Sequence, residues 1–119
     1  MTRATVLILA ATLAGCARRS APAVALAGDA QRGRLAVERY GCGACHVIPG
    51  ATAANGRVGP MLVRFREQAM IAGHAPNTME NLVRWIRDPQ SISPGTAMPN
   101  LGIDDATARD IAAYVYTLR

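Results

Sequence analysis

Apolar residues recur at helical spacing at both ends of the segment that follows residue 27. Near its start, Asp29 is suited to cap a helix that ends at Gly41. The apolar positions of this helix are Ala30, Gly33, Val37 and Tyr40. Near its end, Asp104 and Asp105 open a helix that we expect to run through Leu118, with acidic residues at the positive end of its dipole. Its apolar face is formed by Ile111, Tyr114, Val115 and Leu118.

Gly33 lies inside the first predicted helix, where glycine costs about 1 kcal/mol relative to alanine. A glycine in such a place suggests that another backbone approaches closely. The last helix is the candidate partner.

The middle of the chain contains one further clear helix. Thr78 caps residues 79–88, which Pro89 brings to an end, and the inner face contains Leu82, Trp85 and Ile86. Residues 47–59 are expected to form a loop, and residues 60–73 one or two short helical turns. Since no segment alternates apolar and polar residues as a strand would, the pattern predicts an all-α fold.

The composition limits the size of the core and the class of partner. A chain of 119 residues suits one small domain, and its low aromatic content, 4%, leaves a thin aliphatic core. The formal net charge is +5, with arginine as every basic residue. No basic run is longer than Arg18-Arg19, and aromatic residues are few, so nucleic-acid binding is not supported.

The first 27 residues have the features of an export segment. Arg3 precedes a short apolar run, too short to span a membrane, that predicts a signal peptide over residues 1–15. The run ends in Leu-Ala-Gly-Cys, which resembles the bacterial lipobox and implies a lipid-modified Cys16. Residues 16–27 are then a flexible tether. The alternative is an ordinary secretory signal, and both alternatives place the chain outside the cytoplasm.

Residues 42–46 read Cys-Gly-Ala-Cys-His, which is the attachment pattern for c-type haem. Two thiols two residues apart reach the two vinyl groups at one edge of the porphyrin, and the imidazole that follows reaches the iron. A buried porphyrin would also supply the large apolar body that this core lacks.

Two other uses of paired cysteines stay open at this point. A thioredoxin-like pair would follow a strand and open a helix at the first cysteine, whereas here a helical pattern precedes the pair. A zinc site needs two further ligands, and His74 is the only histidine besides His46.

Met98 is the candidate for the second axial position of the iron. It stands in the sequence Pro-Gly-Thr-Ala-Met-Pro, residues 94–99, where an irregular backbone can present a thioether at a set height. Methionine is more often core filler, and that interpretation is preferred for Met61, Met70 and Met79.

Together, these motifs resemble a class I monohaem cytochrome c. The resemblance rests on the pentad, Val-Gly-Pro at residues 58–60, Trp-Ile-Arg-Asp-Pro at residues 85–89, the Met98 loop, and a last helix containing Ala-Tyr at residues 113–114. It covers residues 28–119 and is closest to the cytochrome c domains fused to subunit II of bacterial haem-copper oxidases. It implies an all-α cytochrome c fold with three main helices around one covalently bound haem c.

The resemblance also implies roles for individual residues. Cys42 and Cys45 would form the thioether bonds, His46 would be the proximal ligand, and Met98 the distal ligand. The carbonyl of Pro60 would accept a hydrogen bond from the proximal imidazole.

Further roles are implied around the porphyrin. Arg57 and Thr96 fall where partners of the haem propionates are found, and Trp85 stands at the distal side. Val37 stands where an aromatic residue is commoner, and His74 has no assigned role.

The resemblance implies a single-electron carrier, and not an enzyme, that links membrane-associated respiratory partners such as a terminal oxidase or a quinol-oxidising complex. With the lipobox, it predicts lipid anchoring on the extracytoplasmic side of a bacterial membrane. Alternatives are a gas-binding module if Met98 does not ligate, a peroxidase, and a fixed subunit of a larger redox complex.

Overall fold

The structure of the protein is a computed structural model, which describes residues 28–119. The predicted signal peptide, residues 1–15, and the tether with Cys16, residues 16–27, lie outside the described residues. Three α-helices carry the fold: α1 (Ala30–Arg39), α2 (Met79–Arg87) and α3 (Asp105–Val115). The short elements are η1 (Cys42–Ala44), η2 (Phe65–Glu67), β1 (Met70–Ile71), β2 (Ala75–Pro76) and η3 (Pro89–Ser91).

Each α-helix begins at the capping residue that the sequence predicts. The Asp29 carboxylate accepts hydrogen bonds from the N–H groups of Gln31 and Arg32 at the start of α1. Thr78 caps α2 in the same way, and Asp104 caps α3. These side chains satisfy N–H groups that a helix leaves unpaired in its first turn.

The last helix ends earlier than predicted. Instead of continuing through Leu118, α3 ends at Val115, and the N–H groups of Thr117 and Leu118 bond three residues back, to Tyr114 and Val115. The Leu118 carbonyl accepts a hydrogen bond from the Arg64 N–H, at 3.0 Å. Leu118 is nevertheless buried, as its place on the apolar face predicts.

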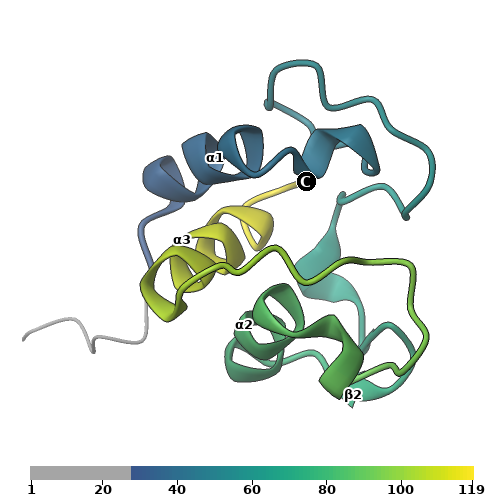
Figure 1. Ribbon diagram of the computed structural model, residues 1–119. Helices are drawn as coiled ribbons and strands as arrows, with labels where there is room; N and C mark the ends of the chain where they lie inside the picture. The colour runs from purple at the N-terminus through teal and green to yellow at the C-terminus, as the bar shows by residue number, and fades with distance from the viewer. Residues whose placement is uncertain (1–27) are drawn as a thin grey trace, which may run out of the picture.

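The helices α1 and α3 pack side by side, and α2 lies on the other side of α3 (Figure 1). Gly33 stands at the crossing of α1 and α3, where a Cβ atom would lie 2.5 Å from the Asp110 carbonyl carbon. The prediction that Gly33 marks a close backbone approach is therefore confirmed. Asp110 is buried and links α3 to the start of α1 at the same crossing. Its carboxylate accepts hydrogen bonds from the Asp29 N–H and the Arg32 guanidinium.

The core lies between the three helices and is mainly aliphatic. Its most buried members are Val37, Ile48, Ile71, Leu82, Ala108 and Ala112. The buried face of α2 differs from the prediction, since Val83 is buried with Leu82 and Ile86 while Trp85 is only half-buried.

A small antiparallel ladder joins β1 to β2, with Ile71 opposite Ala75. Its turn contains Ala72 and Gly73, both with positive φ, of 50° and 74°. Two-residue strands are too short to show alternation, so the sequence did not reveal them. The fold is otherwise helical, and the all-α prediction is confirmed.

Two of the methionines assigned to the core are exposed: Met61 and Met70. The assignment was wrong because these residues lie in a loop and on an edge strand and not on helical faces. Met79 is partly buried against the core, as predicted. Within residues 28–119, no helix combines the length and apolarity that crossing a membrane requires.

Candidate functional site

The cysteine pair and His46 lie on one tight turn that follows α1. Gly41, in the left-handed region with φ of 70°, turns the chain away from the helix. The carbonyl of Cys42 then accepts hydrogen bonds from the N–H groups of Cys45 and His46, at 3.2 and 3.0 Å. Both cysteines are half-buried, and burial raises the pKa of the Cys42 thiol.

Glycines in the following loop hold this turn in place. The Gly56 N–H donates to the Gly43 carbonyl at 3.0 Å, and the Gly59 N–H donates to the Cys45 carbonyl at 2.8 Å. A Cβ atom on Gly43 would lie 2.6 Å from the Ala54 Cα. Because the two backbone segments touch, side chains at these glycines would force them apart. The sequence showed only a glycine-rich loop here and did not assign this clamp.

The imidazole of His46 is held at two points. Its Nδ1 lies 2.7 Å from the Pro60 carbonyl oxygen, so Nδ1 carries the proton and Nε2 keeps its lone pair free. A Cβ atom on Gly59 would lie 2.7 Å from Nδ1 and 2.9 Å from Nε2, so the backbone of Gly59 packs against the ring. The contact between Pro60 and His46 that the resemblance implies is present.

Met98 is carried by an irregular loop, residues 94–99, which we call the methionine loop. The side chain of Gln90 binds this loop twice, donating from Nε2 to the Thr96 carbonyl at 2.9 Å and accepting from the Gly95 N–H at 2.8 Å. The Thr96 hydroxyl lies 3.4 Å from the Met98 N–H. Gln90 is a positioning residue that sequence reasoning missed, because its role depends on a loop that returns to η3.

His46 and Met98 both line a cavity of about 330 Å³. Cys45, Pro60, Trp85 and Thr96 also line it. An adjoining cavity of about 60 Å³ shares its His46 and Met98 walls and extends past Cys42 to the core. Turn, loop and core thus bring the proposed ligands together.

The donor atoms around the cavities fit a haem group. No charged residue lines either cavity, and most of the walls are aliphatic or aromatic. Cofactor sites typically combine such walls with a few placed polar groups. Here those groups are an imidazole, a thioether and two thiols, which are the ligand and attachment groups of c-type haem.

The other residues that the sequence predicted near the haem differ in whether they line a cavity. Arg57 is exposed and does not line either cavity, whereas Thr96 and Trp85 do line one or both. His74 lies exposed in the turn between β1 and β2. Within residues 28–119, no three side chains of His, Cys, Asp or Glu lie together in the way that a zinc site requires.

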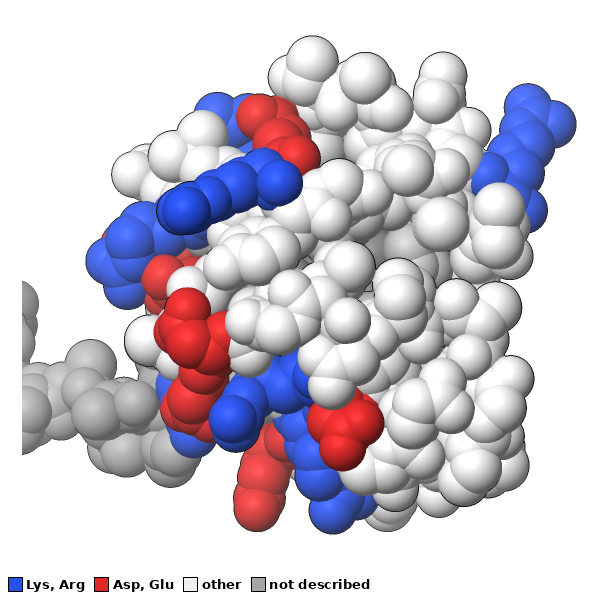
Figure 2. All heavy atoms as spheres, in the orientation of Figure 1, with Lys and Arg blue, Asp and Glu red and all other residues white. Residues whose placement is uncertain are grey.

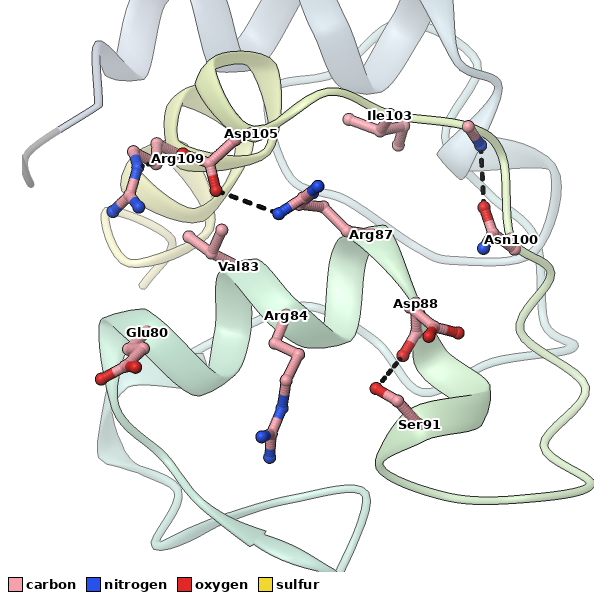
Figure 3. Close-up of a pocket in the computed structure, with 11 residues that line it drawn as sticks. Glu80, Val83, Arg84, Arg87, Asp88, Ser91, Asn100, Ile103, Asp105 and Arg109 are labelled. Carbon is pink, nitrogen blue, oxygen red and sulfur yellow. Dashed lines mark hydrogen bonds and ion pairs between the residues drawn. The ribbon is translucent and has the colours of Figure 1, made fainter.

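A larger cavity, about 760 Å³, is a polar groove elsewhere on the molecule. Figure 3 shows that it lies between α2, the start of α3 and the loop around Asn100. Arg87 and Arg109 both bind the Asp105 carboxylate, at 3.1 and 2.6 Å, so these three charged side chains of the groove pair with one another. No cysteine, histidine or methionine lines it.

Comparison with known proteins agrees with this site. Residues 30–119 match the family model for cytochrome c. The cytochrome c oxidase subunit 2 of Alkalihalophilus pseudofirmus is 39% identical over 90 residues, which are 76% of this chain and 25% of the relative. The corresponding subunits of Bacillus sp. and Bacillus subtilis are 35% and 32% identical, over 53% and 58% of this chain and 18% and 20% of their own lengths.

No solved structure matches the chain. The chain spans a quarter or less of the length of these relatives. The family model nevertheless covers most of the chain, including the cysteine pair, His46 and Met98. The chain therefore belongs to the cytochrome c family and is a haem-binding electron-transfer domain, as its sequence motifs predicted.

Proposed function

We propose that the protein carries single electrons between membrane-associated respiratory partners, with a terminal oxidase as the acceptor. Its cofactor is one haem c, attached covalently to Cys42 and Cys45 and ligated by His46 and Met98. The observation that carries this proposal is that His46, oriented by Pro60, and Met98, held by Gln90, line the same uncharged cavity.

The chemistry follows from what the chain does for the cofactor. When bound, haem c supplies a reversible one-electron couple, and methionine ligation raises its reduction potential. The Pro60 carbonyl holds the Nδ1 proton of His46, which fixes the tautomer and makes Nε2 a stronger donor. The aliphatic walls exclude water, which affects the reduction potential through the local dielectric.

The attachment is tested by removing one thiol at a time. We expect Cys42→Ala and Cys45→Ala each to reduce the haem that stays with the chain on a denaturing gel. Cys16→Ser is the matched control and should keep the same covalent haem as the wild type. If both single variants retained the full amount of covalent haem, the thioether assignment would be wrong.

The axial ligand is tested by Met98→Ala, with Met70→Ala as the control because Met70 is exposed and outside the cavity. Methionine-ligated ferric haem has a weak long-wavelength absorption band, which Met98→Ala should abolish and Met70→Ala should retain. A band that survives in Met98→Ala refutes the assignment. A five-coordinate, high-spin spectrum in the wild type would favour the gas-binding alternative.

The relatives favour one variation of this function, in which the domain is a fixed subunit of an oxidase, since each is named as subunit 2 of cytochrome c oxidase. A fixed subunit should copurify with an oxidase after a high-salt wash, whereas a free carrier should not. The proposed lipid anchor is tested separately: Cys16→Ser should release the exported protein from washed membranes, and continued attachment would contradict the anchor.

A further inference from the structure

We propose that Asn77 is a positioning residue for the haem group. Its side chain holds the part of the cavity wall that Phe65 and Gln68 form, which we call the Phe65 wall. A wall held in this way keeps water from the cofactor and so raises its reduction potential. The inference deepens the proposed function and rests on it, because it takes the cavity to hold haem c.

The side chain of Asn77 joins two segments that lie far apart in the sequence. Its Nδ2 donates to the Phe65 carbonyl at 2.7 Å and to the Gln68 carbonyl at 2.9 Å. Its Oδ1 accepts a hydrogen bond from the Tyr116 hydroxyl, at 2.8 Å, just after the end of α3. Both amide hydrogens and the amide oxygen are therefore used, and because a carbonyl can only accept, the two carbonyls fix which end of the amide faces them.

Tyr116 holds the Phe65 wall from a second side. Its ring stacks on the Phe65 ring, with the centroids 6.4 Å apart and the planes at 29°. Burial raises the pKa of Tyr116, so its hydroxyl keeps its proton and donates to Asn77 at neutral pH. Phe65 is buried and lines both haem cavities, and Gln68 lines the larger one. The contacts of Asn77 therefore reach the surroundings of the cofactor through Phe65.

The Phe65 wall has little regular structure of its own. Phe65 begins η2, which is a single turn of three residues without a side-chain cap. The N–H groups of Glu67 and Gln68 bond three residues back, at 3.0 and 3.1 Å. Such short turns have poor hydrogen-bond geometry, and segments with few contacts open locally at low cost. The two hydrogen bonds from Asn77 oppose this opening by tying the turn to the start of α2.

Water access matters for this haem because charges are scarce around it. Between residues 40 and 63 the only charged residue is Arg57, and between residues 89 and 103 there is none. In Figure 2, charged side chains gather over the side of the helices, and a broad white area covers the side of the loops. Ferric haem carries one more positive charge than ferrous haem, so water that enters the cavity stabilises the ferric form and lowers the potential.

The test is a redox titration of the haem-loaded protein with Asn77→Ala. Alanine removes the three side-chain hydrogen bonds and adds no charge, so we expect reduction to become about three- to tenfold less favourable. Asn81→Ala is the matched control, because the Asn81 side chain donates to the Pro76 carbonyl at 2.9 Å but lines neither haem cavity. It should leave the reduction equilibrium within about 1.5-fold of the wild type.

Tyr116→Phe is a milder second variant. It removes the hydroxyl that holds Asn77 and keeps the ring that stacks on Phe65. Reduction should become about two- to threefold less favourable, less than in Asn77→Ala, because the bonds from Asn77 to the wall remain. This variant tests the proposal even if Asn77→Ala fails to load haem.

Hydrogen exchange, followed by NMR, reports the opening of the wall itself. The Gln68 N–H bonds to the Phe65 carbonyl, and it should exchange about tenfold faster in Asn77→Ala than in the wild type. In Asn81→Ala its exchange should stay within about twofold of the wild type. A general loss of stability would instead speed exchange in α1 and α3 by the same factor, and that result would contradict a positioning role.

Three further results would overturn the proposal. These are a wild-type potential in Asn77→Ala, equal shifts in Asn77→Ala and Asn81→Ala, or loss of the methionine-ligation band in Asn77→Ala, which would assign the shift to the distal ligand. If Asn77→Ala fails to load haem, an unchanged potential in Tyr116→Phe overturns it. Failure of the proposed function is distinguishable, because it would appear in the wild type as missing covalent haem or a missing methionine-ligation band.

Discussion

Gly33 lies where α1 crosses α3, and Gly33→Ala tests whether this crossing is as tight as its geometry indicates. The added Cβ would lie 2.5 Å from the Asp110 carbonyl carbon and 2.9 Å from the Tyr114 Cβ, whereas ordinary contacts begin at 3.4 Å. Because the Asp110 atom belongs to the backbone, no rotamer change relieves the overlap. The two helices must separate instead, by about 0.9 Å to bring the 2.5 Å approach to 3.4 Å.

The magnitude follows from two opposing effects. Overpacking costs about 1–3 kcal/mol, and a clash with backbone belongs at the upper end. Alanine regains about 1 kcal/mol through its better helix propensity. The net loss is therefore about 2 kcal/mol, which for a domain of this size lowers the melting temperature by about 8–16 °C.

The assay is thermal and urea unfolding of the haem-loaded protein, followed by circular dichroism. Gly41→Ala is the matched control: Gly41 has no neighbouring atom within 4 Å of a Cβ, so alanine there meets only the left-handed backbone cost, about 1 kcal/mol. If Gly33→Ala were as stable as the wild type or more stable, α1 and α3 would separate freely and the reasoning would be refuted.

Three further substitutions test the crossing of α1 and α3, the orientation of His46 and the methionine loop. The guanidinium of Arg32 holds the pKa of Asp110 below its ordinary value, so the stabilisation by Asp110 should be complete above about pH 4 and decline as the pH falls further. Asp110→Asn should cost about 1–3 kcal/mol at pH 7 in urea unfolding and flatten the stability profile at acid pH; an unchanged profile would contradict this. Gly59→Ala should tilt the imidazole of His46 and shift the reduction potential, and a potential equal to that of the wild type would show that the backbone contact does not orient the ring. Gln90→Ala removes both hydrogen bonds to the methionine loop, so the methionine-ligation band should disappear at a lower temperature than in the wild type, with an unchanged transition as the contrary result.

The helix starts could be predicted because their signals are local. A capping side chain binds N–H groups two or three residues ahead, so Asp29, Thr78 and Asp104 identified the starts of α1, α2 and α3. The end of α3 could not be predicted in the same way. Beyond it the Leu118 carbonyl accepts a hydrogen bond from the Arg64 N–H, and these two residues stand far apart in the sequence.

At the proposed haem site, too, local sequence signals could be predicted and contacts between distant segments could not. The sequence predicted the proposed attachment and ligand groups, because the spacing of Cys42, Cys45 and His46 matches the porphyrin edge and Met98 stands in an irregular loop. It also indicated Pro60 through the family resemblance, and the contact with His46 is present in the structure. The clamp formed by the loop glycines was not visible, because it consists of backbone contacts between separate segments.

By itself, the sequence predicted the helix starts, the family and the proposed ligand atoms, since helical periodicity, capping and motif spacing are properties of neighbouring residues. Only the tertiary structure decided which apolar side chains are covered. It buried Val83, left Met61 exposed and brought Val58 and Leu101 to two adjoining cavities that share His46 and Met98. The physical reason is that burial depends on what packs against a residue from elsewhere in the chain, and a linear pattern does not contain that information.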